Sequence, residues 1–302
     1  MKQPPYLQKG DTVRIISTAR KAFQTDLEAA TGVLKSWGLN VVFGSSIGPE
    51  DHQFAGTDEI RAADLQHSLD DASVKAIICA RGGYGTVRII DRINFSTFAA
   101  RPKWIVGFSD ATVLHSHIQA LYQIPTLHAV MPTIFRFDEA GLRAQETMHR
   151  ALFGETLQYL VPQKSPLLRT GQAEGMLVGG NLSILFSLLG SASDISTEGK
   201  ILFIEDLDEY LYHIDRMLIA LKRAGKLDKI RGLVVGGMVE MNDNDTPFGK
   251  TAEEIIWEHV AEYSYPVCFD FPAGHIRDNR ALLLGKTVRF SVSPKDITLQ
   301  FI

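Results

Sequence analysis

Short apolar runs alternate with longer amphipathic segments through the first half of the chain. Apolar runs without internal alternation predict parallel strands that are covered on both faces. Apolar residues spaced three and four apart predict helices between these runs. The alternation of strand and helix therefore predicts a mostly parallel sheet flanked by helices. The expected strands are residues 12–17, 40–44, 74–80 and 104–108, and the expected helices are residues 25–38, 57–70 and 111–123.

Two of these helices carry terminal signals. Gly38 is expected to end the first helix, since glycine is a common stop just after the last helical residue. Thr57 is expected to cap the second helix through its hydroxyl. The apolar residues available for the inner face of that second helix are Ile60, Ala63 and Leu65.

The pattern changes after about residue 155. Residues 156–180 are rich in Pro, Gly, Ser and Thr and carry few helix signals, so we expect a linker at 161–167. This linker would divide an N-terminal α/β domain, 1–160, from a C-terminal α/β domain, 168–302, that is rich in β-strands. The last two strands of the second domain alternate apolar and polar residues, which predicts a C-terminal hairpin with one face in water. The strands expected in this domain are residues 201–206, 230–239, 265–271, 286–292 and 296–302, and the expected helices are residues 213–225 and 251–263.

The composition is that of an ordinary globular protein. Hydrophobic residues make up 45% and charged residues 22% of the 302 residues, so neither disorder nor a fibrous repeat is indicated. The net charge of −4 shows no basic excess. The electrostatic attraction that dominates binding to nucleic acids and anionic membranes is therefore missing, and neither is an expected partner.

The two cysteines, Cys79 and Cys268, each lie in an apolar run that predicts a buried strand. A disulfide framework is therefore not expected. The N-terminal residues lack the apolar core of a signal peptide, and no stretch approaches the ~20 apolar residues that span a bilayer. The cytoplasm is the expected compartment.

A sharp turn follows the fourth expected strand. The sequence WIVGFSDAT (104–112) runs from that strand through a Gly-X-Ser turn into a helix. Such a turn resembles a nucleophile elbow, which lifts a hydroxyl above the sheet edge and places the positive helix N-terminus behind it. Ala111 stands where the usual G-x-S-x-G pattern has its last glycine. The alternative is that Ser109 or Asp110 caps the helix.

A second turn, ARGGYG (80–85), also joins a strand to a helix. Its glycines allow the backbone to approach a ligand and to aim N–H groups at it. It matches neither a Walker A loop nor the G-x-G-x-x-G spacing. One interpretation is a plain turn that needs positive φ. The other is that the N–H of Gly82 or Gly83 joins that of Asp110 to form an oxyanion hole.

A nucleophilic serine needs a base, and the chain has nine histidines. His275 lies after a strand, in a turn crowded with charged residues, which indicates a site; a salt-bridged surface loop is the alternative. His128 follows an expected strand and is a candidate to line the same cleft. His115 and His117 lie two apart on one helix and cannot share a face, so no zinc site is expected. The remaining histidines, which we expect at the surface, are His52, His67, His149, His213 and His259.

The strand ILFIED (201–206) is expected to supply a carboxylate that orients the base. It delivers Glu205 and Asp206 to its C-terminal end, where ligands collect in parallel α/β sheets. A carboxylate there could hold His275 in the required tautomer and stabilise its imidazolium. The alternative is that these acids cap the next helix. Glu209 is a less direct candidate because it lies further from the strand end.

Together these segments resemble the LD-carboxypeptidase A family, the cytoplasmic muramoyl-tetrapeptide carboxypeptidases, which are serine peptidases with a Ser-Glu-His triad. The resemblance runs in order through nearly the whole chain, and the joint pattern is far more specific than any single motif. One departure is TARKAF (18–23), where family members often have a small polar pair, so this loop is expected to line the pocket differently. The segments that carry the resemblance are KGDTVRIIS (9–17), FAGTDEIRAADL (54–65), ARGGYG (80–85), GFSDAT (107–112), VGGNLSIL (178–185), LFIEDLDEYLYHIDRML (202–218) and FPAGHIRDN (271–279).

The resemblance implies roles for particular residues. Ser109 would be the nucleophile, His275 the general base and Glu205 the acid that orients it. Asp110 and a glycine of the 80–85 turn would donate backbone N–H groups to the oxyanion. The active site would lie between the two domains, no metal or cofactor would be needed, and the chain would form a homodimer. The candidates for binding substrate are Arg81, Tyr84 and Arg277, with Arg81 or Arg277 as the cation for a terminal carboxylate.

The implied activity is release of the terminal D-Ala from a cytoplasmic murein tetrapeptide during peptidoglycan recycling. The bond cut would join the L-configured centre of the diamino acid to D-Ala. One alternative is the microcin-immunity branch of the same family, which cleaves peptidyl or aminoacyl nucleotides with the same triad. The sequence contains no added aromatic-rich insertion that would bind adenine. An alternative of another class is a non-catalytic protein that binds small anions at the 80–85 turn, which would leave Glu205 and His275 without a purpose.

Overall fold

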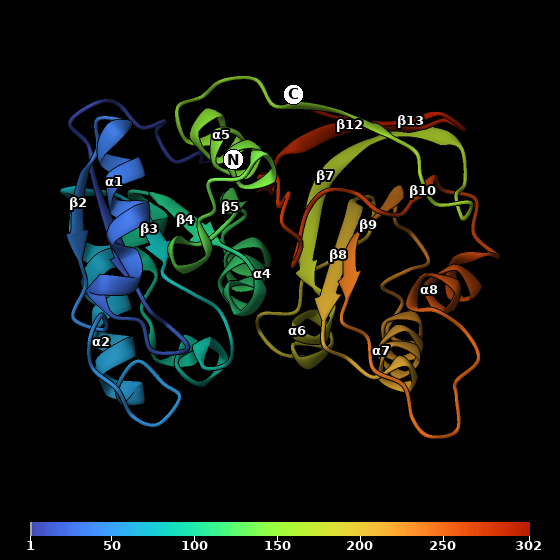
Figure 1. The fold of residues 1–302 in the computed structure, drawn as a ribbon, viewed down its shortest axis with the longest axis horizontal. Coiled ribbons are helices and arrows are strands. Elements are labelled where there is room, and N and C mark those ends of the chain that lie inside the picture. The colour runs from blue at the N-terminus through green and yellow to red at the C-terminus, as the bar shows by residue number, and fades with distance from the viewer. Residues whose placement is uncertain (1) are drawn as a thin grey trace.

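The computed structural model describes residues 2–302 and arranges them in two sheets that are covered by helices (Figure 1). The first sheet has six strands in the order β11-β5-β4-β3-β1-β2. Five of them run parallel, as the sequence predicts, and only β11 is antiparallel to its neighbour. The strands are β1 (Thr12–Ile16), β2 (Asn40–Phe43), β3 (Val74–Cys79), β4 (Trp104–Gly107), β5 (Thr126–His128) and β11 (Leu282–Leu284).

Helices pack on both faces of this sheet (Figure 1). The predicted helix over 25–38 is a 3-10 turn, η1 (Gln24–Leu27), followed by α1 (Glu28–Ser36), and Gly38 follows it with a φ of 86°. The other α-helices are α2 (Asp58–Asp70), α3 (Ser96–Ala100), α4 (Thr112–Leu121) and α5 (Glu139–Leu152), and the short 3-10 helices are η2 (Thr86–Arg88), η3 (Ile90–Arg92), η4 (Ser109–Ala111) and η5 (Pro132–Ile134).

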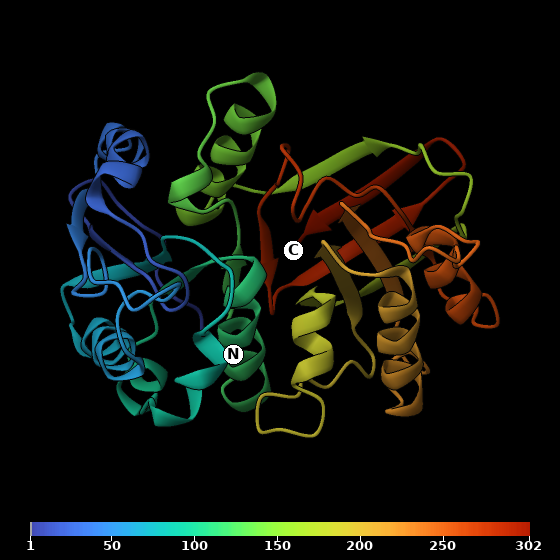
Figure 2. The ribbon, with the colours of Figure 1, turned by 60° about the horizontal axis from the view of Figure 1, so that its bottom comes forward.

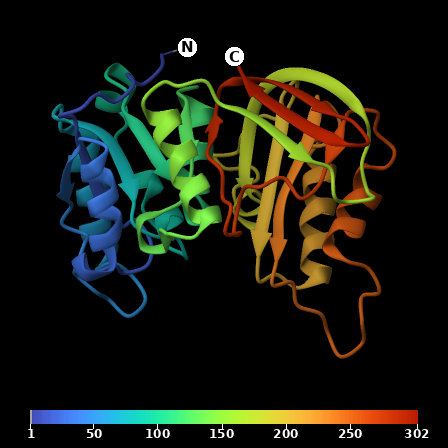
Figure 3. The same ribbon diagram turned by 45° about the horizontal axis from the view of Figure 1, so that its top comes forward.

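The second sheet has seven strands in the order β10-β9-β8-β7-β12-β13-β6. Strands β7 to β10 run parallel, whereas β12, β13 and β6 are antiparallel. Figure 3 shows the red strands β12 and β13 between the yellow-green β6 and β7, so the predicted C-terminal hairpin is confirmed. The strands are β6 (Gln158–Pro162), β7 (Gly171–Asn181), β8 (Ile201–Leu207), β9 (Gly232–Val239), β10 (Val267–Cys268), β12 (Thr287–Val292) and β13 (Asp296–Phe301), and the helices are α6 (Leu182–Ser187), α7 (Leu211–Arg223) and α8 (Ala252–Val260).

Residues 156–180, within which we expected a linker at 161–167, contain two strands. β6 pairs with β13, and β7 lies at the centre of the second sheet between β8 and β12. The sequence did not predict β7, because this strand contains several glycines and polar residues. Its first residues are half exposed, and its last five are buried. Strand β11 was also missed: it leaves the C-terminal half and joins the first sheet beside β5. The two sheets are therefore not two separate stretches of sequence.

The inner face of α2 differs from the expected one. Thr57 caps it as predicted, its hydroxyl accepting from the N–H of Ile60. Ala63, however, is exposed, and the buried side chains include Arg61. The reason is that α2 lies over loops whose carbonyls need donors: Arg61 donates to the carbonyls of Thr18 and Gly85 at 2.8 and 2.9 Å. A purely apolar face would leave these carbonyls without partners.

Two adjacent glycines of β7 allow close contacts, one with β8 in the same sheet and one with α4. A Cβ on Gly179 would overlap the carbonyl of Phe203 in β8, and a Cβ on Gly180 would lie 2.6 Å from Oγ1 of Thr112 in α4. The same Thr112 hydroxyl accepts from the backbone N–H of Asn181 at 3.1 Å. Figures 1 and 2 show α4 and α6 next to each other between the sheets, and these two helices are in contact. The glycine pair thus fixes β7 against both β8 and α4.

Both cysteines are free and buried, Cys79 in β3 and Cys268 in β10. None of the helices within residues 2–302 combines the length and the apolar composition that crossing a membrane requires.

Substitution of Gly179 by alanine should destabilise the protein by at least ~2 kcal/mol more than the same change at Gly190, because the added Cβ has to displace packed backbone. Both glycines have positive φ, but a Cβ on Gly190 meets nothing within 4 Å, so only the conformational cost of ~1–2 kcal/mol applies there. Urea unfolding of the two variants measures the difference. Equal losses of stability would show that the close approach of β7 to β8 is not a constraint.

Candidate active site

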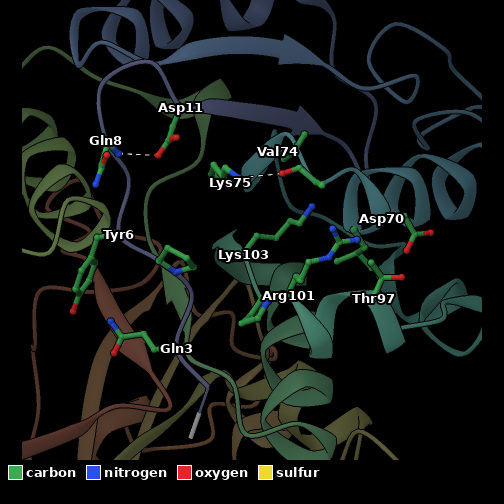
Figure 4. Close-up of a pocket in the computed structure, with 14 residues that line it drawn as sticks. Gln3, Tyr6, Gln8, Asp11, Asp70, Val74, Lys75, Thr97, Arg101 and Lys103 are labelled. Carbon is green, nitrogen blue, oxygen red and sulfur yellow. Dashed lines mark hydrogen bonds between the residues drawn. The ribbon is translucent and has the colours of Figure 1, made fainter.

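Two cavities of similar volume lie at opposite ends of the strands. One, of about 560 Å³, is bounded by the residues that precede β1, β3 and β4 and includes Tyr6, Lys75, Arg101 and Lys103 (Figure 4). No serine, cysteine or histidine lines it. The other, of about 550 Å³, lies at the carboxyl ends of β3, β4, β7 and β8, where parallel α/β folds bind ligands. Residues of both sheets line this second cavity, which we call the central cavity.

Ser109 lines the central cavity directly after β4. Its φ of 61° is in the left-handed region, a conformation that costs ~1–2 kcal/mol for a residue with a side chain. Neither η4 nor α4 has a side-chain cap hydrogen bond, so the alternative that Ser109 or Asp110 caps the helix is wrong. The strained turn instead carries the serine hydroxyl into the cavity wall, with the N-terminus of α4 close behind it.

The glycine turn lies against Ser109. A Cβ on Gly82 would be 2.8 Å from the Ser109 hydroxyl oxygen, so only glycine fits beside it. Gly83 and Gly85 have positive φ, as the plain-turn interpretation requires. The N–H groups of Gly82 and Gly83 donate to no other group in residues 2–302, and both residues line the central cavity. The turn therefore needs its glycines for conformation and also presents free donors to the cavity.

Asp110 is a buried anchor. Its carboxylate accepts from the N–H of Thr86 at 2.9 Å and so ties the turn after β4 to the end of the glycine turn. Burial raises the pKa of Asp110, although hydrogen bonds from Thr86 and Gly85 and the charge of Arg61 oppose the shift. The side chain of Asp110 thus holds two cavity segments together.

His275 and Glu205 form a hydrogen-bonded pair. Nδ1 of His275 lies 2.7 Å from Oε2 of Glu205, and the backbone N–H of His275 donates to the same oxygen at 3.2 Å. The Glu205 side chain is fully buried at the end of β8, and His275 lines the central cavity together with Ser109. The His275 ring also packs on Phe108, with ring centroids 4.8 Å apart. No hydrogen bond joins Ser109 to His275 in the described chain.

The hydrogen-bonded pair of Glu205 and His275 excludes two alternatives that the sequence left open. His275 does not lie in a salt-bridged surface loop, because its partner is a fully buried carboxylate. Glu205 and Asp206 do not cap α7, which begins without a side-chain cap. The carboxylate instead fixes which ring nitrogen of His275 carries the proton, since Nδ1 must donate to an ionised oxygen.

The loop that carries His275 is held in place by further contacts with Glu205, Asn279 and His128. Gly274 has a φ of 104°, and a Cβ there would be 2.6 Å from Oε2 of Glu205. Oδ1 of Asn279 accepts from the N–H of Gly274 at 2.9 Å and from Nε2 of His128 at 3.2 Å. His128 was expected as a candidate to line the cleft, but it is fully buried and does not line the cavity. Burial lowers the pKa of His128 to about 3, so it supports the loop as a neutral ring.

The charges around His275 favour its protonated form. Burial lowers the pKa of His275, but the charge and hydrogen bond of Glu205, with smaller effects of Asp206 and Glu240, outweigh it and raise the pKa above its ordinary value. Asp206 also lines the cavity, and burial together with the charge of Glu205 raises its pKa to about 7. Both its oxygens are used: Asn181 and Leu207 donate to one and Ser183 to the other.

The residues expected to bind substrate divide into two groups. Arg81 and Tyr84 line the central cavity. Arg277 does not: its side chain is exposed and lies 3.9 Å from Asp138. Sequence reasoning missed Arg20, which lines the cavity and packs against Gly83. The departure from the family pattern at 18–23 was the signal that could have found it.

Asp208 was also missed, and Glu209 was considered only as a less direct candidate to orient His275. Both line the cavity on the side of the second sheet. Nδ1 of His213 lies 2.5 Å from Oε2 of Glu209, and Asn242 donates to Asp208 at 2.8 Å. His213 is therefore not a free surface histidine. His52 and His67 are exposed as expected, whereas His149 and His259 are half buried and pair with Glu155 and Asp215.

His115 is fully buried between Thr126 and the carbonyl of Gly107, and burial lowers its pKa to about 4. His117 points elsewhere and contacts the hydroxyl of Ser193 at 2.9 Å. Across residues 2–302, no group of three or more His, Cys, Asp or Glu side chains has an arrangement that could hold a metal ion.

Two family models match the chain. One, described as the LD-carboxypeptidase N-terminal domain, matches residues 13–129, and one described as the LD-carboxypeptidase C-terminal domain matches residues 174–290. A "probable murein peptide carboxypeptidase" of Bacillus subtilis (strain 168) is 36% identical over 301 residues, which cover 99% of this chain and 94% of that protein.

Two solved structures share the fold over nearly their whole length. The muramoyltetrapeptide carboxypeptidase of Oxalobacter formigenes aligns with a TM-score of 0.86 at 27% identity and covers 96% of this chain and 98% of its own. The microcin C7 self-immunity protein MccF, in complex with aspartyl sulfamoyl adenosine, aligns with a TM-score of 0.87 at 20% identity and covers 98% and 97%. At that identity the second similarity shows a common fold alone.

Replacement of Glu205 by glutamine should lower the pKa of His275, because the charge and the hydrogen bond that raise it are removed while the burial that lowers it stays. NMR titration of the His275 ring protons measures this shift. Glu198→Gln, on the surface, is the control and should leave the titration unchanged. An unchanged pKa in the Glu205→Gln protein would mean that the carboxylate does not govern the protonation of His275.

Proposed function

Because the chain belongs to the LD-carboxypeptidase family, we propose that it is a serine carboxypeptidase that releases the terminal D-Ala from a murein tetrapeptide. The names of its relatives support a peptide substrate of this class. The observation that carries the proposal is that Ser109, on a strained turn, shares one cavity with a histidine that is bonded to a fully buried glutamate.

In the proposed reaction, Oγ of Ser109 attacks the carbonyl carbon of the diamino acid while Nε2 of His275 takes the hydroxyl proton. Glu205 accepts from Nδ1 of His275 and stabilises the imidazolium that forms. His275 then gives its proton to the departing amine of D-Ala, which leaves an ester on Ser109. Water attacks that ester with His275 again as the base, and Ser109 regains its hydroxyl. Hydrogen bonds between catalytic groups often tighten only when substrate binds, so we expect the Ser109–His275 hydrogen bond to form in the complex with substrate.

Backbone donors beside Ser109 suit the oxyanion of the tetrahedral intermediate. The N–H groups of Gly82 and Gly83 are free in the described chain, and the N–H of Asp110 follows Ser109 at the start of η4. Donors fixed in advance stabilise developing charge without reorganising during the reaction. The buried Asp110 side chain keeps the two donor segments in register through Thr86.

An exopeptidase also needs a cation for the terminal carboxylate of its substrate. Of the two candidates from the sequence, Arg81 lines the central cavity and Arg277 does not, which favours Arg81. Arg20 lines the same wall and is an additional candidate. With the carboxylate on this wall, the D-Ala side of the scissile bond would lie toward the first sheet. The proposal extends to a homodimer that acts in the cytoplasm during peptidoglycan recycling.

A defined L-Ala-D-Glu-diamino acid-D-Ala peptide should yield free D-Ala and the tripeptide, detected by mass spectrometry. Ser109→Ala and His275→Ala should each lower kcat by roughly 10⁴- to 10⁶-fold, as in other serine triads. Gly190→Ala serves as a folded control outside the cavity. A Ser109→Ala protein that keeps most of its activity would end the assignment.

The same assay separates the alternatives. Cleavage of an aminoacyl sulfamoyl-adenylate in place of the tetrapeptide would identify an enzyme of the microcin-immunity kind. A serine-directed phosphonate should label Ser109 selectively. Absence of labelling together with absence of cleavage would favour a non-catalytic protein that binds small anions.

The pH dependence should follow His275. The base must be neutral to accept a proton, so kcat/KM should rise with pH through the raised pKa of His275, with its acid limb above 6.5. Asp206→Asn should move this limb to lower pH, because the charge of Asp206 contributes to the raised pKa. A limb that stays in place in this variant, or that lies below 6.5 in the native protein, would contradict the prediction.

A further inference from the structure

The central cavity has walls of opposite charge. Arg20 and Arg81 line it from the first sheet, whereas Asp208 and Glu209 line it from the second. No ion pair joins the two walls within residues 2–302, and neither arginine pairs with any carboxylate there. Charges that face one cavity without pairing are free to bind a ligand that carries both signs.

The acids of the second wall are not equivalent. Asp206 has both oxygens occupied by donors of the protein, so it has no free oxygen for a ligand. Asp208 is exposed, and only its Oδ1 is used, by Asn242. Glu209 uses Oε2 for His213, and its Oε1 accepts from no group in the described chain. Each of these two carboxylates thus uses one oxygen for a hydrogen bond within the protein and has its other oxygen free.

Asp208 and Glu209 lie close in the sequence to a residue of the proposed catalytic group. Asp208 and Glu209 follow Glu205 within one short segment at the end of β8, and Glu205 holds His275. Asp208 has a φ of 59°, so the segment turns sharply there, and both residues line the cavity. A backbone held this way and two side chains held by Asn242 and His213 make a rigid anionic subsite.

We infer that Asp208 and Glu209 form a subsite for a primary ammonium group on the side chain of the residue whose carbonyl Ser109 attacks. This inference rests on the proposed peptidase function. With the terminal carboxylate on the cationic wall, the acyl side of the scissile bond extends toward the acidic wall. A diamino acid places an ammonium group at the end of a flexible chain on that side, and charge-assisted hydrogen bonds to the two carboxylates would favour its binding there.

The test compares two tetrapeptides, L-Ala-D-Glu-L-Lys-D-Ala and the same peptide with L-norleucine, which is lysine without its amino group. The native protein should show a kcat/KM at least roughly tenfold higher for the lysine peptide. Glu209→Gln and Asp208→Asn keep the shape of each side chain and should both reduce this ratio. Glu198→Gln, an exposed acid outside the cavity, should keep the native ratio.

A ratio near one in the native protein, or an equal loss on both peptides in both variants, would overturn the inference. Binding measured by calorimetry separates it from the peptidase proposal. If Ser109→Ala binds the lysine peptide more tightly than the norleucine peptide while the native protein cleaves neither, the acidic subsite stands and the peptidase proposal falls. Equal binding of the two peptides overturns the subsite whatever the activity.

Discussion

The buried carboxylate of Glu205 is the group on which the arrangement of the central cavity depends. An ionised carboxylate without water is costly unless donors compensate it. His275 supplies two of them, from its ring and from its backbone, and both reach the same oxygen. The loop that carries His275 can approach this closely only because Gly274 has no side chain to collide with the glutamate. Asn279 and the neutral His128 then hold that loop from behind.

The need for close approach recurs around Ser109. Gly82 leaves room for the Ser109 hydroxyl, and Gly180 leaves room for Thr112 at the start of the following helix. The backbone N–H of Asn181 donates to Thr112, and the side chain of Asn181 donates to Asp206, the neighbour of Glu205. A continuous set of short contacts therefore connects the strand that carries the glutamate to the helix behind the serine. Small displacements at this interface would misalign groups that must react.

The opposite charges on the two walls of the central cavity would orient a bound ligand. The arginines lie on the wall of the first sheet and the free carboxylates lie on the wall of the second. A zwitterionic peptide would be oriented by both walls at once. The glycine turn and the Glu205–His275 pair lie along the same cavity, so binding and bond cleavage use a single space.

Much of the fold follows from local pattern. Short, mostly apolar runs placed β1, β3, β4 and β8 correctly, because strands covered on both faces have few polar positions. The same reasoning failed for β7, whose glycines are chosen for close packing and not for strand propensity, and for β11, whose partner β5 lies far away in the sequence. The polar inner face of α2 was missed because Arg61 serves carbonyls of loops that the sequence does not place beside it.

The sequence by itself determined which residues carry the chemistry: a serine on a sharp turn, a histidine in a charged loop and a glutamate at a strand end, each within its own local motif. Only the tertiary structure decided which of these groups share a cavity, that Arg277 points away while Arg20 lines the wall, and that Asp208 and Glu209 each keep one oxygen free. The physical reason is the distance along the sequence over which each kind of interaction acts. Backbone conformation and helix caps depend on neighbouring residues, whereas burial, unpaired charge and shared cavities depend on segments that folding alone brings together.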